Sequence, residues 1–239
     1  MNVEPLQILY QDDYYIAVHK PAGLLVHRSR IDAGEHRFCL QLLRDQIGKP
    51  VHPCHRLDKP TSGVLLFALD KESLGLGSAL FKARTTRKIY HAVVRGWTEE
   101  ADVIDHPLSY KEEGRTLRGG GEPQEARTAY RRLRQFEINQ PVGEFPTARY
   151  SELELVPASG RMHQLRRHMK HIHHPIIGDT RYGDGFHNRL FREKFDSHRL
   201  LLVASSLEFM HPITEKMVQI TRGVDLEFDN VLQKLSLRA

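Results

Sequence analysis

The stretch that most constrains the fold is HRLDKPTSG at residues 55–63, followed directly by the apolar run VLLFAL at residues 64–69. The Pro-Thr-Ser-Gly part is typical of a turn. An uninterrupted apolar run of this length, bounded by turn residues, predicts a strand buried on both faces. Asp58 is therefore expected at a loop or strand end against the core, where little water reaches its carboxylate. A carboxylate in that setting needs a cationic or hydrogen-bonding partner to stay ionised.

The setting of Asp58 has two interpretations. Carboxylates with a perturbed environment are common at catalytic sites, and structural ion pairs create the same environment. The stretch alone leaves both interpretations open, so the choice between them depends on the rest of the chain.

The composition favours a globular protein with a basic surface. Hydrophobic residues make up 40% of the 239-residue chain and charged residues 27%, which is ordinary for such proteins. A formal net charge of +5 and a pI near 9.2 fit a polyanionic partner such as nucleic acid. The N-terminus lacks the pattern of a secretory signal, and no apolar run is long enough to span a bilayer. These features predict a cytoplasmic protein without membrane association.

The pattern of apolar residues predicts more strands than helices and no regular βαβ alternation. The fold class is therefore expected to be α+β, with a mainly antiparallel mixed sheet flanked by helices and loops. Strands are expected at residues 6–10, 14–18, 24–26, 64–69, 89–94, 150–156, 200–204, 207–210 and 218–220, and from residue 128. Helices are expected at residues 40–47, 71–84, 161–172, 188–196 and 228–235. Residues 85–88 are expected to form a cationic turn. We expect one catalytic domain over residues 1–239, with a long mobile loop at 110–128.

Several alternative chemistries are weakly supported. Cys39 and Cys54 indicate no disulfide framework, and a thiol nucleophile at Cys54 is less favoured than a buried structural cysteine. Lys59 is not preceded by the glycine loop of a nucleotide-binding site. The histidines between residues 163 and 174 could ligate a metal. However, the run contains no HExxH pattern, and the arginines beside it would repel a cation. We therefore predict no metal site and no cofactor.

Basic residues gather around the same segments as Asp58. This distribution favours a polyanionic substrate that meets a carboxylate. The residues concerned are Arg28, Arg30, Arg56, Lys59, Arg84, Arg87, Lys88, Arg161, Arg166 and Arg167.

Four segments resemble the motifs of the RluA-type pseudouridine synthases, and they follow one another along the chain in the same order as in that family. HRLDKPTSG at 55–63 is the most specific of them, and HKPAGLLVH at 19–27 is similar to the N-terminal motif of the family. RKIYHAVVRG at 87–96 and SGRMHQLRRH at 159–168 resemble the two later motifs, and HPIIGDTRYG at 174–183 resembles the loop that follows. The resemblance covers nearly the whole chain, without the RNA-binding S4 domain that precedes the first motif in several relatives.

The resemblance implies a role for three residues. Asp58 stands at the position of the covalent catalyst, Tyr90 at that of the active-site tyrosine, and Arg166 at that of the arginine that pairs with the aspartate. Tyr90 is then expected to stack on the uracil and to remove its C5 proton, and Arg166 to keep Asp58 ionised. Further residues of the motifs are expected to bind the RNA substrate: Lys20, His55, Arg56, Thr61, Arg87, Lys88, Arg161, His163 and Gln164.

The resemblance also implies a substrate. It is strongest to family members that act on tRNA, which points to uridine 65 at the junction of the acceptor and T stems. Separately from the resemblance, we expect a monomer. A ribosomal RNA substrate is the alternative within the same chemistry. Two further alternatives are an RNA chaperone without catalysis and a histidine-site metallohydrolase that acts on RNA.

Overall fold

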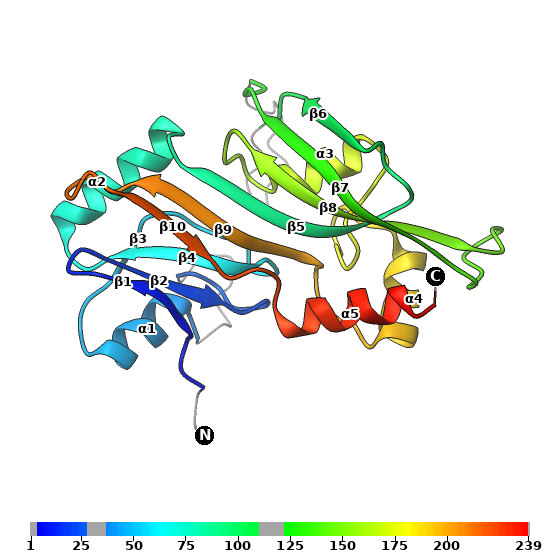
Figure 1. Cartoon of the computed structure of the whole chain (residues 1–239), viewed down its shortest axis with the longest axis horizontal. Helices are drawn as coiled ribbons and strands as arrows, with labels where there is room; N and C mark the ends of the chain where they lie inside the picture. The colour runs from blue at the N-terminus through cyan, green and yellow to red at the C-terminus, as the bar shows by residue number, and fades with distance from the viewer. Residues whose placement is uncertain (1–3, 28–36, 110–121, 239) are drawn as a thin grey trace. The chain divides into compact units, whose positions relative to one another are not determined.

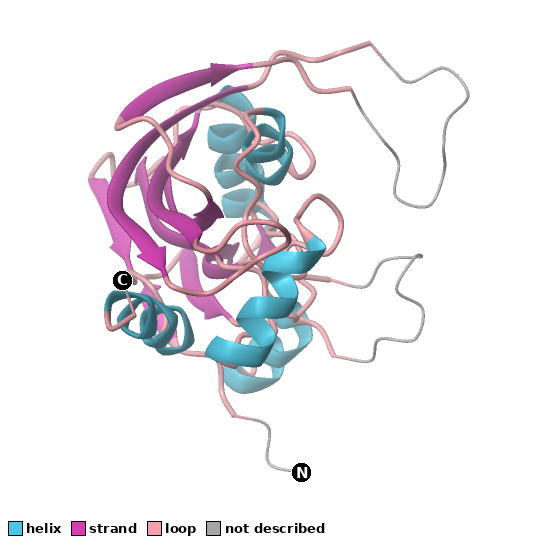
Figure 2. Ribbon diagram, turned by 90° about the vertical axis from the view of Figure 1, so that its right-hand side faces the viewer, coloured by secondary structure: helices cyan, strands magenta, loops and turns pink. Residues whose placement is uncertain are grey.

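The computed structural model of the chain describes residues 4–27, 37–109 and 122–238. The described residues form ten strands and five helices, shown in Figure 1 by label and in Figure 2 by colour. They divide into two compact units, a first unit of Met1–Lys88 with Ala204–Gly223 and a second unit of Ile89–Val203 with Val224–Ala239. Residues 110–121 of the expected mobile loop lie outside the described residues, and the single domain stays a prediction.

The sheet of the first unit is built mainly from antiparallel pairs of strands. It contains β1 (Ile8–Gln11), β2 (Tyr15–Lys20), β3 (His52–Pro53), β4 (Ser62–Ala68), residues 204–210 of β9 (Leu202–Met210), and β10 (Met217–Thr221). The strand order is β1-β2-β4-β9, with β3 paired to β4 and β10 paired to β9. Every residue of β4 is buried, which confirms the strand that the apolar run at 64–69 predicts.

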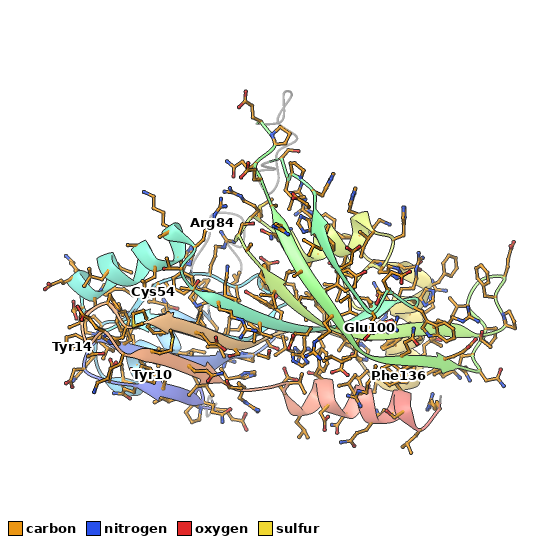
Figure 3. All side chains as sticks on the ribbon, turned by 45° about the horizontal axis from the view of Figure 1, so that its top comes forward. Tyr10, Tyr14, Cys54, Arg84, Glu100 and Phe136 are labelled. Atoms are coloured by element: carbon orange, nitrogen blue, oxygen red, sulfur yellow. The ribbon has the colours of Figure 1, made fainter. Side chains whose placement is uncertain are left out.

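Each of the two helices of the first unit has one end where its capping residue predicts it. α1 (Cys39–Ile47) ends at Gly48, whose left-handed φ of 67° suits a residue without a side chain. α2 (Lys71–Ala83) begins after Asp70, whose carboxylate accepts a hydrogen bond from the Ser73 N–H at 2.8 Å. The apolar core of this unit includes Cys54 and Leu66, and the labelled Cys54 can be followed in Figure 3.

The second unit is built on long strands. It contains most of β5 (Arg87–Arg95), together with β6 (Ala101–Asp105), β7 (Arg127–Ile138) and β8 (Ala148–Pro157), in the order β5-β8-β7-β6. The helices are α3 (Gln164–His171), α4 (Gly185–Phe195) and α5 (Leu226–Ser236). One apolar cluster joins β7 and β8 to α4 and α5 through Phe136, Tyr150, Phe191 and Phe228. Phe136 is labelled in Figure 3.

Several details of the predicted elements are wrong, and β6 lies where no strand is expected. The expected strand at 24–26 is an isolated bridge between Leu25 and Phe38. The strands expected at 200–204 and 207–210 are one continuous strand, β9. The strand β5 begins at Arg87, inside the expected cationic turn. The helix expected from residue 161 starts at Gln164, because His163 has a left-handed φ of 54° that a helix cannot contain.

No helix formed by the described residues is both long and apolar enough to cross a membrane.

Candidate active site

Asp58 lies in the turn that leads into β4. Its carbonyl accepts a hydrogen bond from the Thr61 N–H at 3.1 Å, which closes the turn, and the Thr61 side chain is buried. Asp58 itself is only partly buried. The residue is therefore less enclosed than the sequence predicts.

Lys20 holds the segment next to Asp58 from inside the fold. Its side chain is 0% exposed, and its ammonium donates to the carbonyls of Pro21 at 2.9 Å, Leu24 at 2.8 Å and Lys59 at 3.1 Å. The Lys59 carbonyl also accepts the Gly23 N–H at 2.9 Å. The predicted contact of Lys20 with RNA stays a prediction, and what the structure shows is a buried ammonium that supports the turn.

His55 is a neutral residue that packs within the first unit. Its Nε2 accepts the Leu66 N–H at 3.1 Å, and its ring stacks on Phe81 with centroids 4.4 Å apart. Burial, helped by the positive charge of Lys88, lowers the pKa of His55 to about 3. His55 therefore carries no positive charge for RNA at neutral pH. The adjacent Arg56 is exposed, as a residue that contacts a substrate must be.

The two basic residues at the start of β5 have different environments. Arg87 donates from Nη1 to Glu208 Oε1 at 3.0 Å, and its side chain remains 53% exposed. Burial, with a contribution from the charge of Arg84, lowers the pKa of Lys88. Both remain candidates for RNA contact, and Glu208 already balances part of the charge of Arg87.

Tyr90 lies on β5 in the second unit, opposite Leu155 of β8. Its side chain is partly buried and packs against an apolar cluster that includes Leu165 and Met169 of α3. A ring that is fixed on one side by packing and open on another suits a stacking platform for a base.

Arg166 lies near the start of α3 and forms a buried, two-pronged ion pair with Asp179. Nε donates to Oδ2 at 2.7 Å and Nη2 donates to Oδ1 at 2.9 Å, and the two side chains are 6% and 1% exposed. Burial alone would raise the pKa of Asp179. The hydrogen bonds and charge of Arg166, together with the N–H groups of Tyr182 and Arg181, outweigh burial and bring that pKa below its ordinary value.

Three other predicted RNA-binding residues lie around the start of α3. Gln164 uses its whole amide: Oε1 accepts from Ser159 Oγ and the Arg161 N–H, and Nε2 donates to the Arg127 carbonyl and Thr128 Oγ1. The RNA contact of Gln164 stays a prediction, and in this structure the amide has no remaining hydrogen-bonding capacity.

His163 and Arg161 differ from Gln164 in exposure. His163 is buried, with Nδ1 at 3.1 Å from the Tyr182 hydroxyl, and its RNA contact stays a prediction. Arg161 is partly exposed and donates from Nε to the Glu125 carbonyl at 3.1 Å. Of the residues predicted for RNA binding around α3, only Arg161 keeps the accessibility that the role requires.

The alternative chemistries gain no support from the geometry. Cys54 is buried, and burial raises the pKa of its thiol to about 12, so the thiol is not an activated nucleophile. In the part of the chain that the structure describes, no group of three or more His, Cys, Asp or Glu side chains could hold a metal ion. His168, from the His-rich run, contacts Thr128 Oγ1 and the His106 carbonyl, which is a structural arrangement.

The three predicted catalytic residues are distributed over both units. Asp58 belongs to the first unit, and Tyr90 and Arg166 belong to the second. The pairing of Arg166 with Asp58 stays a prediction. Sequence reasoning missed Asp179, because this residue follows only the short apolar pair Ile176-Ile177 and lacks the long apolar run that singles out Asp58.

Comparisons with known proteins agree over nearly the full length of the chain. The sequence profile of the RNA pseudouridylate synthase family matches residues 14–171. A "tRNA pseudouridine synthase C" of Vibrio parahaemolyticus is 52% identical over 223 residues, 92% of this chain and 91% of the relative. The protein of the same name from Vibrio cholerae is 51% identical over 234 residues, 96% of this chain and 95% of the relative.

A solved structure gives the same result at the level of the fold. The human RNA pseudouridylate synthase domain containing 1 superposes with a TM-score of 0.72 at 26% identity, covering 94% of this chain and 85% of the human chain. The α+β fold class is thereby confirmed. The chain therefore belongs to the RluA-type RNA pseudouridylate synthases, the enzymes that isomerise uridine to pseudouridine in RNA.

Proposed function

We propose that the substrate is tRNA and that the target is uridine 65, at the junction of the acceptor and T stems. The observation that carries this proposal is the identity of about half of all residues to relatives named for tRNA, extending over 92% and 96% of this chain. The excess of positive charge, +5 for the chain, agrees with a polyanionic substrate. A tRNA substrate also implies action in the cytoplasm.

Asp58 acts at the ribose of the target uridine. In the isomerisation the bond from ribose C1′ to uracil N1 breaks, the uracil turns, and a bond from C1′ to C5 forms. The proton on C5 leaves and N1 gains a proton, so atoms and electrons balance without a redox step. Asp58 either attacks the ribose or removes a proton from it, and in both cases it must be ionised and accessible. Its partial exposure in the turn before β4 supports this role.

Arg166 and Tyr90 complete the site. Arg166 keeps Asp58 ionised through its positive charge, which a guanidinium retains at every relevant pH. Tyr90 stacks on the uracil and removes the C5 proton. The partial burial of Tyr90 against the apolar cluster supports a fixed ring.

The target uridine must leave its helical stack before these residues can reach it. Arg56 is exposed and two residues before Asp58. It fills the space that the base vacates or binds a neighbouring phosphate.

The test is an assay of the purified protein on an unmodified tRNA transcript. We expect pseudouridine at position 65, and none when the transcript carries cytidine there. A ribosomal RNA fragment is assayed in parallel. Modification of the ribosomal fragment alone would keep the chemistry and overturn the substrate, whereas binding of either RNA without conversion would favour a chaperone.

A further inference from the structure

We infer that Asp179 is a positioning residue for the reaction, which sets the orientation of the Arg166 guanidinium. This inference rests on the proposed role of Arg166. It concerns a carboxylate outside the proposed catalytic set of Asp58, Tyr90 and Arg166.

The two oxygens of Asp179 fix one edge of the guanidinium. Oδ2 receives Nε at 2.7 Å and Oδ1 receives Nη2 at 2.9 Å, so the plane and the rotation of the group are both determined. The ring of Tyr182 lies beside the guanidinium, 5.2 Å from Cζ to the ring centroid. An arginine held by one edge presents its remaining N–H groups in a single direction.

Asp179 is itself held rigidly. Its Oδ1 also accepts the N–H groups of Arg181 and Tyr182, each at 2.9 Å. Its carbonyl accepts the Gly183 N–H at 3.0 Å and Asn188 Nδ2 at 2.9 Å. A side chain at position 183 would place its Cβ 2.1 Å from that same carbonyl oxygen. The turn therefore allows the carboxylate little movement.

A second buried pair in the same unit provides a matched control. Arg199 Nη1 donates to both carboxylate oxygens of Asp225 at 2.8 Å, and these side chains are 9% and 11% exposed. Asp225 also receives a backbone N–H, from Phe228 at 3.0 Å, at the start of α5. Both aspartates thus pair with an arginine in a largely buried setting, although Arg199 also lies 3.4 Å from Glu227 Oε2, and only Asp179 contacts the arginine of the proposed site.

The experiment compares Asp179→Asn with Asp225→Asn. Each asparagine keeps an oxygen for the backbone N–H groups, removes the charge, and places an NH2 group against the arginine. Measured are the single-turnover rate at saturating enzyme, the Kd for tRNA and the Tm. We expect Asp179→Asn to slow turnover by about 100-fold, the scale of a misplaced catalytic group, with Kd unchanged. Asp225→Asn should lower Tm and leave the turnover of the folded enzyme unchanged.

Arg166→Met and the double variant show whether Asp179 acts through Arg166. If it does, adding Asp179→Asn to Arg166→Met causes no further loss of rate. A normal rate for Asp179→Asn beside a slow Arg166→Met would overturn this inference alone. A normal rate for Arg166→Met would overturn the proposed role of Arg166. If Asp179→Asn does not fold, Asp179→Glu, with Asp225→Glu as its control, keeps the charge and displaces the guanidinium. Asp179→Glu must then slow turnover, and a normal rate for this variant would contradict the inference.

Discussion

At the scale of single residues, the proposed mechanism depends on an ionised and accessible carboxylate at position 58. We predict that Asp58→Asn abolishes pseudouridine formation, because the amide can neither attack the ribose nor accept its proton. Folding and tRNA affinity should remain nearly those of the wild type. Pseudouridine formation and tRNA Kd are measured on the same preparation. The control is Asp45→Asn, at an exposed ion pair with Arg44. A measurable rate in Asp58→Asn would refute the assignment.

His55 gives a prediction for stability rather than catalysis. Its pKa in the fold is about 3, far below the value of an unfolded histidine near 6.5, so the unfolded chain binds the proton more readily. This contribution to stability is complete above pH 6.5 and is lost as the pH falls from there toward 3. Chemical denaturation between pH 7 and pH 4 should give a shallower loss of stability for His55→Gln than for the wild type. Equal slopes would show that His55 titrates normally in the fold.

The sequence proposes which residues are catalytic, but it does not describe their environments well. The polar turn before an apolar strand is enough to single out Asp58. That pattern does not predict that Asp58 is partly exposed. Lys20, His163 and Gln164 were expected to contact RNA, and the structure buries each of them in hydrogen bonds within the fold. A motif shows which side chains a family uses together. It does not separate those that contact the substrate from those that hold the loops in place.

At the scale of elements, the start of β4 requires a glycine. Gly63 has a φ of +119°, and a Cβ there would lie 2.1 Å from the carbonyl oxygen of Ala204. We predict that Gly63→Ala destabilises the protein by about 3 kcal/mol or more, because backbone strain and a backbone clash combine. Gly48→Ala, with a φ of +67° and nothing within 4 Å of the added Cβ, should cost only about 1 kcal/mol. Urea denaturation measures both, and equal costs would contradict the clash.

The start of β5 is the element with the best remaining evidence for contact with RNA phosphates. We predict that replacing Arg87 and Lys88 together by Gln weakens tRNA binding and reduces the slope of log K against log salt by about 1 to 2. The control replaces Arg131 and Arg134, which face Glu154 and Glu152 across β7 and β8. The control should leave the slope unchanged. An unchanged slope in the Arg87 and Lys88 variant would show that these charges face away from the RNA.

Elements were predicted well where a local signal fixes them. Asp70 and Gly48 mark helix ends by their own chemistry, and the apolar run at 64–69 is long enough to identify β4. The start of α3 was missed because it depends on the left-handed backbone of His163. No propensity of a histidine predicts that conformation. It accompanies the contact with Tyr182 and the hydrogen bonds of Gln164, which form only in the folded unit.

At the scale of the whole molecule, the proposed catalytic residues come from both compact units. The chain passes between the units within β5, which carries Lys88 in the first and Tyr90 in the second, and again within β9. The proposed chemistry requires Asp58 to meet the tyrosine and the arginine on the substrate. This expectation comes from the resemblance of the four ordered motifs to those of the family. The spacing of residues along a chain contains no information about how two units meet.

The most direct test of the central claim is pseudouridine mapping of total RNA from cells with and without this protein. Carbodiimide adducts on pseudouridine stop reverse transcriptase, so each modified position gives a stop. We predict that one stop, at position 65 of tRNA, disappears in cells without the protein. This stop should return when the wild-type protein is restored, but not when Asp58→Asn is supplied. A stop lost from ribosomal RNA instead, or no lost stop at all, would contradict this prediction.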